Sequence, residues 1–66
     1  MRIEDYHEED GNVSFMVDSD KYQKSLDHLR SKKLRANGHF SGRRLSEIFV
    51  GATIDRVNEA LMDFNG

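Results

Sequence analysis

No cysteine occurs in this chain of 66 residues, so neither a disulfide nor a thiolate-bound metal can stabilise its fold. A chain of this length buries only roughly 60% of the surface that it exposes when unfolded, which leaves it marginally stable. The histidines His7, His28 and His39 are far apart in the sequence and lack the spacing of metal ligands. Association with another chain is the remaining aid, and we therefore expect one small domain that forms a homodimer.

The sequence contains no apolar run long enough to cross a membrane, and its acidic beginning differs from signal and transit peptides. The absence of cysteine is typical of a reducing compartment. The sequence therefore predicts a cytoplasmic protein that does not bind membranes.

Charge is segregated along the chain. Residues 1–20 carry a formal charge of −6, residues 21–44 carry +7, and residues 45–66 carry −3, within a net charge of −2. The basic segment can attract phosphate groups. Alternatively, it can meet the acidic segments of its own chain or of a dimer partner.

The clearest strand lies at residues 12–17, where apolar and polar residues alternate. Val13, Phe15 and Val17 would face the core, and Asn12, Ser14 and Met16 would face outward. Asp10-Gly11 before it favours a two-residue hairpin turn. Residues 1–11 are then either the first strand of that hairpin or an unpaired acidic arm.

A helix is predicted over residues 20–35, because Tyr22, Leu26, Leu29 and Leu34 recur at helical spacing. Residues 18–20 offer side-chain oxygens for its N-cap, and Asn37-Gly38 would end it.

Three interpretations remain open for residues 39–66. The segment forms two helices with a break at Gly51 and an N-cap at Thr53, or one continuous helix, or a short strand at residues 45–50 before a final helix. We expect an α+β fold with a short N-terminal strand or β-hairpin followed by two or three helices. Residues 12–66 would form this strand-helix-helix domain. The predicted core comprises Val13, Phe15, Val17, Tyr22, Leu26, Leu29, Leu34, Leu45, Ile48, Phe49, Val57, Leu61 and Phe64.

No pattern of catalytic residues stands out. Ser41 and Ser46 near His39 lack the glycine-flanked turn of a nucleophilic serine, and Glu8, Glu9 and Asp10 lie beside a turn glycine, without the burial that a catalytic carboxylate pair needs. We expect no enzymatic activity, no catalytic residue, no cofactor, no metal and no small-molecule substrate.

The basic residues near one predicted interhelical loop are the most distinctive cluster. Arg30, Lys32, Lys33 and Arg35 close the first helix, and Arg43 and Arg44 open the next element, so the six would form one positive patch. Phe40 is the only aromatic residue among them, which disfavours a platform for stacking single-stranded bases.

The order strand (13–17), helix (20–35) and helix (43–64) resembles the ribbon-helix-helix repressors. Leu45-Ser46-Glu47-Ile48-Phe49 is also similar to the opening of that family's second helix. The resemblance implies that two chains pair their strands into a ribbon, on which Asn12, Ser14 and Met16 would read bases. A helix-turn-helix is disfavoured, because Asp55, Glu59 and Asp63 on its recognition helix would repel phosphate.

Two functions follow as hypotheses. The first is a DNA-binding, repressor-like homodimer, with nucleic-acid contacts from Asn12, Ser14, Met16, Lys32, Lys33, Arg35, Arg43 and Arg44. The alternative is a small protein-binding inhibitor, or antitoxin-like modulator, that docks through its acidic and basic patches. Its acidic contacts would come from Glu4, Asp5, Glu8, Glu9 and Asp10.

Overall fold

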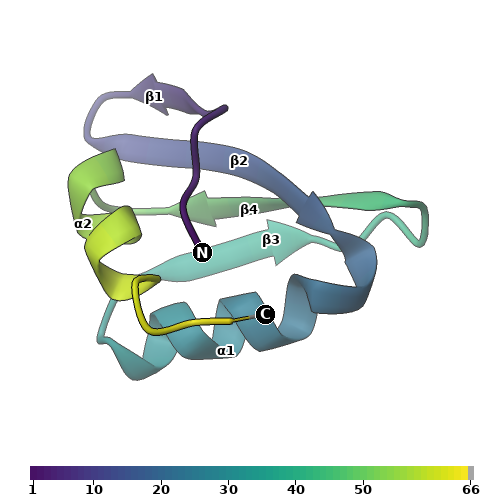
Figure 1. Ribbon diagram of the computed structural model, residues 1–66. Helices are drawn as coiled ribbons and strands as arrows, with labels where there is room; N and C mark the ends of the chain where they lie inside the picture. Colours follow the sequence, from purple (N-terminus) through teal and green to yellow (C-terminus); the bar gives the residue numbers. More distant parts are fainter. Residues whose placement is uncertain (66) are drawn as a thin grey trace.

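The computed structural model describes residues 1–65, which form one four-stranded antiparallel sheet and two α-helices (Figure 1). The strand order across the sheet is β1-β2-β4-β3. The elements are β1 (His7–Glu9), β2 (Asn12–Asp18), the 3₁₀ turn η1 (Ser19–Lys21), α1 (Tyr22–Ser31), β3 (Ala36–His39), β4 (Leu45–Val50) and α2 (Ile54–Ala60).

The predicted turn at Asp10-Gly11 joins β1 and β2. Both residues have positive φ, 50° and 79°, as a two-residue hairpin of type I′ requires. Of the two interpretations of residues 1–11, the hairpin strand is therefore present, over three residues. The predicted alternation in β2 is also confirmed, since Val13, Phe15 and Val17 are buried and Asn12 and Met16 are exposed.

Helix α1 is shorter than predicted, because it ends before Asn37-Gly38. Lys33 adopts a positive φ of 65°, and the Leu34 amide donates to the Leu29 carbonyl at 3.2 Å. This left-handed cap ends the helix at Ser31. The predicted N-cap is wrong too, since the side chain of Asp18 makes no capping hydrogen bond and a 3₁₀ turn precedes the helix. The apolar stripe is confirmed for Tyr22, Leu26 and Leu29, which are buried on α1; Leu34 is also buried but follows the helix.

The predicted order, a strand or hairpin followed only by helices, is wrong, because two further strands lie between α1 and α2. Residues 36–39 and 45–50 are strands, and β4 lies between β2 and β3, where it pairs with both. The strand interpretation of residues 45–50 is the one that the structure bears out. Its inward residues Ser46, Ile48 and Val50 are almost completely buried, with period two. Hydrogen bonding on both sides outweighs the helical spacing of Leu45, Ile48, Phe49 and Ala52, which suggested a helix.

Both edges of β2 are paired within the chain, with β1 on one side and β4 on the other. This strand therefore has no free edge on which a second chain could form a two-stranded ribbon.

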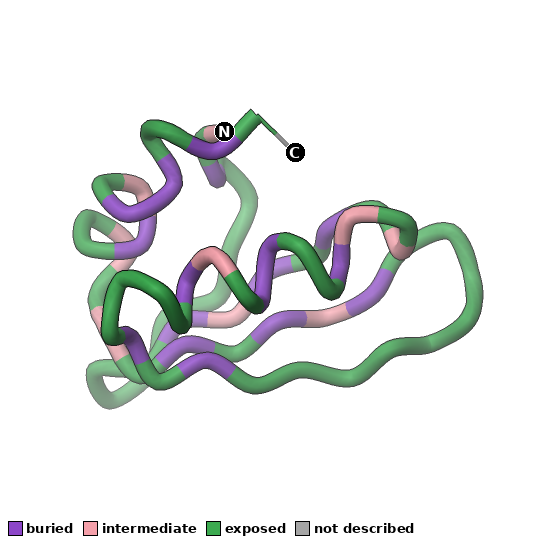
Figure 2. Tube along the Cα trace, turned by 90° about the horizontal axis from the view of Figure 1, so that it is seen from below, coloured by how far each residue is buried: buried purple, intermediate pink, exposed green. Residues whose placement is uncertain are grey.

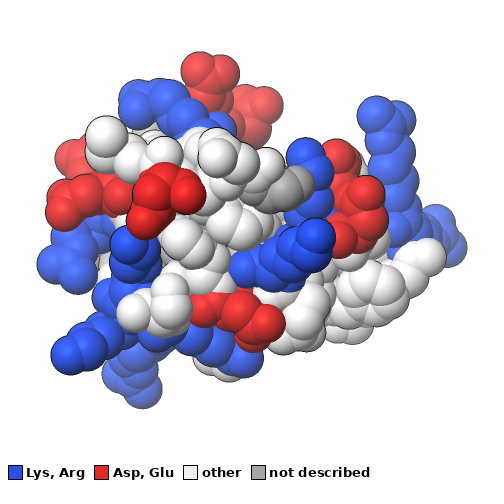
Figure 3. Space-filling model, turned by 60° about the horizontal axis from the view of Figure 1, so that its bottom comes forward, with Lys and Arg blue, Asp and Glu red and all other residues white. Residues whose placement is uncertain are grey.

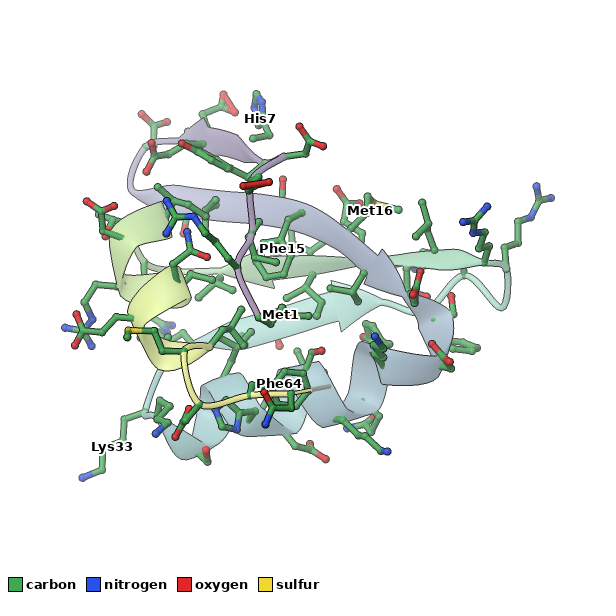
Figure 4. The ribbon with its side chains drawn as sticks, in the orientation of Figure 1. Met1, His7, Phe15, Met16, Lys33 and Phe64 are labelled. Carbon is green, nitrogen blue, oxygen red and sulfur yellow. The ribbon has the colours of Figure 1, made fainter. Side chains whose placement is uncertain are left out.

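Helix α2 begins as predicted at the Thr53 N-cap, whose hydroxyl accepts from the Arg56 amide at 3.3 Å. Both helices cover the same face of the sheet, and buried positions recur on the sides of α1 and of the strands that face each other (Figure 2). The side chains of Phe15, Met1 and Phe64 lie on this same face of the sheet and contribute to the core (Figure 4).

The core differs from the prediction at two positions. Leu45 and Phe49, predicted to be buried, are 42% and 46% exposed, because they point to the face of β4 that the helices do not cover. The other predicted core residues are buried, and they are joined by Ile3, Ala36, Val50 and Ala60.

The two ends of the chain lie beside each other. The amino group of Met1 donates to the carbonyls of Leu61 and Phe64, at 3.0 and 2.8 Å. If the chain were joined there and opened between β1 and β2, its element order would be the β-α-β-β-α-β of split β-α-β folds. Strand β1 thus occupies the place next to β2 that the last strand takes in such folds.

Candidate interaction surface

One face of the sheet carries no helix in the described part of the chain, and we call it the open face. Strand alternation and pairing place two rows of side chains across its middle. His7, Ser14, Phe49 and Asn37 form one row, and Met16, Glu47 and His39 form the next. The remaining side chains on this face are Glu9, Asn12, Asp18, Leu45 and Arg35.

Apolar side chains lie along the two central strands of the open face. Met16, Phe49 and Leu45 are 50%, 46% and 42% exposed, and they come from the two central strands, β2 and β4. Glu47 lies between Leu45 and Phe49 on β4 and opposite Met16, and Ser14 lies opposite Phe49. Exposed apolar side chains on the middle of a sheet are typical of a surface that another molecule covers.

Phe49 lies between two hollows in this surface. One hollow, of about 550 Å³, is lined by Asn12, Arg35, Asn37, Phe49, Val50 and Gly51. The other, of about 320 Å³, is lined by His7, Glu9, Asp10, Asn12, Val13, Ser14 and Phe49. Both hollows are open and shallow, so the Phe49 ring is accessible from two sides, with hydrogen-bonding side chains such as Asn12 beside it.

The margins of the open face differ in charge. Glu9 and Asp10 lie at the β1–β2 turn, on the edge of the sheet formed by β1. Arg35 lies on the opposite edge, just before β3, and Arg43 and Arg44 belong to the loop between β3 and β4. The β1 margin therefore carries carboxylates, and the β3 margin carries the Arg35 guanidinium.

The single basic patch predicted from the sequence does not form. Lys32 and Lys33 follow α1, whereas Arg43 and Arg44 precede β4, and the six residues of β4 separate the two ends of the sheet by about 20 Å. Lys33 points away from the molecule (Figure 4). On the helix side, basic and acidic side chains are interspersed (Figure 3).

Three of the predicted phosphate ligands have acidic neighbours within the chain. The Lys32 Nζ lies 2.9 Å from a carboxylate oxygen of Asp63. Arg43 and Arg44 line a shallow depression together with Asp18, Ser19 and Asp20. One base of the +7 segment is thus ion-paired and two share a depression with acidic side chains, while Arg35 accompanies Asn12 on the open face.

The acidic residues predicted to bind a partner protein also separate. Glu8 faces the helix side, where its carboxylate accepts from the Ile54 amide at 3.5 Å, whereas Glu9 faces the open side. Glu4 and Asp5 are exposed on the segment that leads to β1. These five residues therefore do not form one docking patch.

Asp63 fastens the segment after α2 to α1. The hydrogen bond from Lys32, and then that from His28, lower the pKa of the Asp63 carboxyl to about 2. The His28 ring also packs against Phe64, with 4.9 Å between ring centroids. This cluster is on the helix side of the molecule, away from the open face.

The serines considered for catalysis have structural hydrogen bonds. Ser46 is completely buried, and its hydroxyl lies 2.6 Å from that of Ser19. The hydroxyl of Ser41 donates to the Leu45 carbonyl and so holds the β3–β4 loop. Within residues 1–65, no group of three or more His, Asp or Glu side chains is placed to hold a metal.

The sequence did not single out Phe49 as a surface residue. The signal that could have found it was the strand interpretation of residues 45–50, in which Leu45, Glu47 and Phe49 share one face. In the described part of the chain, neither helix has the length and apolar character needed to span a bilayer. Comparison with protein-family models, curated protein sequences and solved structures gives no match.

Proposed function

We propose that this protein is a non-enzymatic protein-binding module that docks through the open face of its sheet. The observation that carries the proposal is the exposure of Met16, Leu45 and Phe49 on the two central strands. Aromatic residues and methionine are enriched at the centres of protein interfaces, and charged residues are depleted there. Met16 and Phe49 are therefore the anchors of the proposed contact.

The charge distribution supports a protein partner over duplex DNA. Binding to duplex DNA depends on several cations that are free to meet phosphates. Lys32 is paired with Asp63, and Arg43 and Arg44 lie beside Asp18 and Asp20. The remaining pattern, with carboxylates at the β1 margin and the Arg35 guanidinium at the β3 margin, is the kind of complementarity that sets partner choice between proteins.

A second candidate function is binding of single-stranded nucleic acid, and it rests on the hollow beside Phe49. A base stacked on the Phe49 ring would have the amides of Asn12 and Asn37 within the same hollow and the Arg35 guanidinium near its phosphate. Glu47, next to Phe49 on the open face, opposes this binding by repelling phosphate.

Self-association is the simplest form of the proposed activity, and it agrees with the homodimer expected for so short a chain. The proposed location is the cytoplasm. Disulfides rarely form in that reducing compartment, so the absence of cysteine is not a disadvantage there.

The test compares the wild-type protein with F49S, using K24E as a control, because Lys24 is exposed on α1 and away from the open face. Each is immobilised and incubated with a lysate of the source cells, and bound proteins are identified. A protein partner held by the wild type and K24E, and lost by F49S, is the expected result. Equal capture by all three would overturn the proposal.

A parallel titration measures the fluorescence anisotropy of labelled single-stranded and duplex oligonucleotides at increasing salt. Binding of the single strand that weakens with salt and is lost in F49S would move the assignment to the second candidate. Binding of duplex alone, unchanged in F49S, would contradict both.

A further inference from the structure

We propose that the partner on the open face is a second copy of this chain, packed sheet on sheet about a twofold axis that runs parallel to the strands between β2 and β4. This inference rests on the proposed function, since it uses the same surface, and it names the partner. Charge and side-chain size across that face both favour a second copy as the partner.

The decisive row of side chains runs from Glu9 on β1 to Arg35 before β3. Glu9 pairs with Asn12, and a β-carbon on Gly51 would lie 3.5 Å from the Asn12 side-chain oxygen and 3.6 Å from the Arg35 Cβ. The row is therefore Glu9, Asn12, Gly51, Arg35. It spans three strand spacings, about 14 Å, with a carboxylate at one end and a guanidinium at the other.

A twofold axis parallel to the strands exchanges the two margins of the sheet. Each Glu9 then lies over the partner's Arg35, and the contact occurs twice because a twofold interface is isologous. A twofold axis perpendicular to the strands would instead set acidic margin over acidic margin and basic over basic. Opposed like charges cost free energy, so the charge distribution selects the first arrangement.

Side-chain size agrees with the same axis. Because Phe49 and Ser14 are directly opposite each other on β4 and β2, the rotation places each Phe49 ring over the partner's Ser14. A large side chain over a small one is the packing that lets two sheets approach to about 10 Å. Met16 covers the stem of the partner's Glu47, whose carboxylate has His39 beside it on β3.

The edges of the sheet offer less room for association. On β3, the Arg30 guanidinium donates to the Ala36 carbonyl at 2.9 Å and covers that edge. Strand β1 has only three residues. Short or covered edge strands resist pairing with another chain, which leaves the open face as the surface for a second copy.

The proposed contact is small. The central strands have seven and six residues and the edge strands only three and four, so the open face covers at most about 20 Å by 20 Å. That is below the size of most permanent interfaces. We therefore expect a dimer that dissociates on dilution, and the experiment must follow the monomer–dimer equilibrium over a wide range of protein concentration.

Sedimentation equilibrium of the full chain measures the dimer dissociation constant for the wild type, E9R, R35E and the double variant E9R/R35E. Each single change replaces two attractive contacts with two repulsive ones, so we expect a dissociation constant about tenfold higher. The double variant restores both contacts with reversed charge, and its dissociation constant should return to about that of the wild type. K24E, with the same charge change as R35E but on α1, should leave it unchanged.

F49S provides the second test, and its circular dichroism spectrum and unfolding curve establish that it folds. A folded F49S that is monomeric supports the inference. A monomeric wild type at all concentrations overturns the second copy as partner, and the proposed function then depends on Phe49-dependent capture of another protein alone. A dimer that survives in F49S, or that the double variant fails to restore, overturns the inference by assigning the contact elsewhere.

Discussion

Arg30 on α1 forms a hydrogen bond with the first residue of β3: its guanidinium Nε donates to the Ala36 carbonyl at 2.9 Å. The Gly51 amide donates to the Arg35 carbonyl, so the backbone polar groups of Arg35 point toward β4. The backbone N–H and C=O of the next residue, Ala36, therefore point away from the sheet. Arg30, which the sequence placed in a basic patch, thus binds an outward carbonyl on the free edge of β3.

Replacing Arg30 with alanine should lower the free energy of unfolding by about 1–2 kcal/mol, because a partly buried hydrogen bond from a charged donor is lost. The exposed edge should also promote association that salt does not reverse. Urea unfolding and light scattering measure the two effects. K33A is the matched control, since Lys33 points to solvent; equal stability of R30A and K33A would argue against edge protection.

Gly38 on β3 should not tolerate alanine. A β-carbon there would lie 2.6 Å from the Glu47 carbonyl oxygen and 2.6 Å from the Tyr22 ring, both closer than van der Waals contact allows. We expect G38A to lose about 1–3 kcal/mol of stability as the strand and ring move apart. G51A is the control, because its β-carbon would meet atoms only at 3.5 Å or beyond. Thermal unfolding of the two variants checks this, and equal midpoints would contradict the close approach.

Replacement by serine should destabilise the protein much more at Phe15 than at Phe49. Phe15 is 3% exposed, and F15S should cost about 3–5 kcal/mol through a lost core contact and a cavity. Phe49 is 46% exposed, so F49S should cost about 1 kcal/mol while it removes the binding surface. Denaturant unfolding measures both. Comparable losses would mean that Phe49 is a core residue, as the sequence predicted.

Asp63 should make the protein sensitive to acid. Its folded-state pKa is lowered from 3.8 to about 2, so its pairing with Lys32 and His28 stabilises the fold above about pH 4. That contribution is lost as the pH falls from 4 through 2, because the carboxyl becomes protonated. D63N should lower the unfolding midpoint at neutral pH and flatten its dependence on pH between 4 and 2. D5N, on an exposed segment, is the control, and a wild-type slope in D63N would contradict the assignment.

The features predicted correctly from the sequence are local ones. Asp10-Gly11 tolerates positive φ at both positions and so defines its turn without help from distant residues. The alternation in β2, the apolar stripe of α1 and the Thr53 cap likewise depend on residues a few positions apart. Charge segregation is also a property of the sequence, but the positions of the charged side chains in the folded protein are not.

Only the tertiary structure decided that residues 45–50 form a strand and which side chains lie on the open face. Leu45, Ile48 and Phe49 satisfy helical spacing, and they form a strand because β2, about thirty residues away, and β3 supply hydrogen-bond partners on both sides. That pairing turns Phe49 outward, beside Ser14 and Asn37, and places Glu9 and Arg35 on opposite margins. The sequence by itself determined the local turn, stripe and cap; long-range strand pairing decided which side chains share a face, because that pairing fixes which residues lie opposite one another.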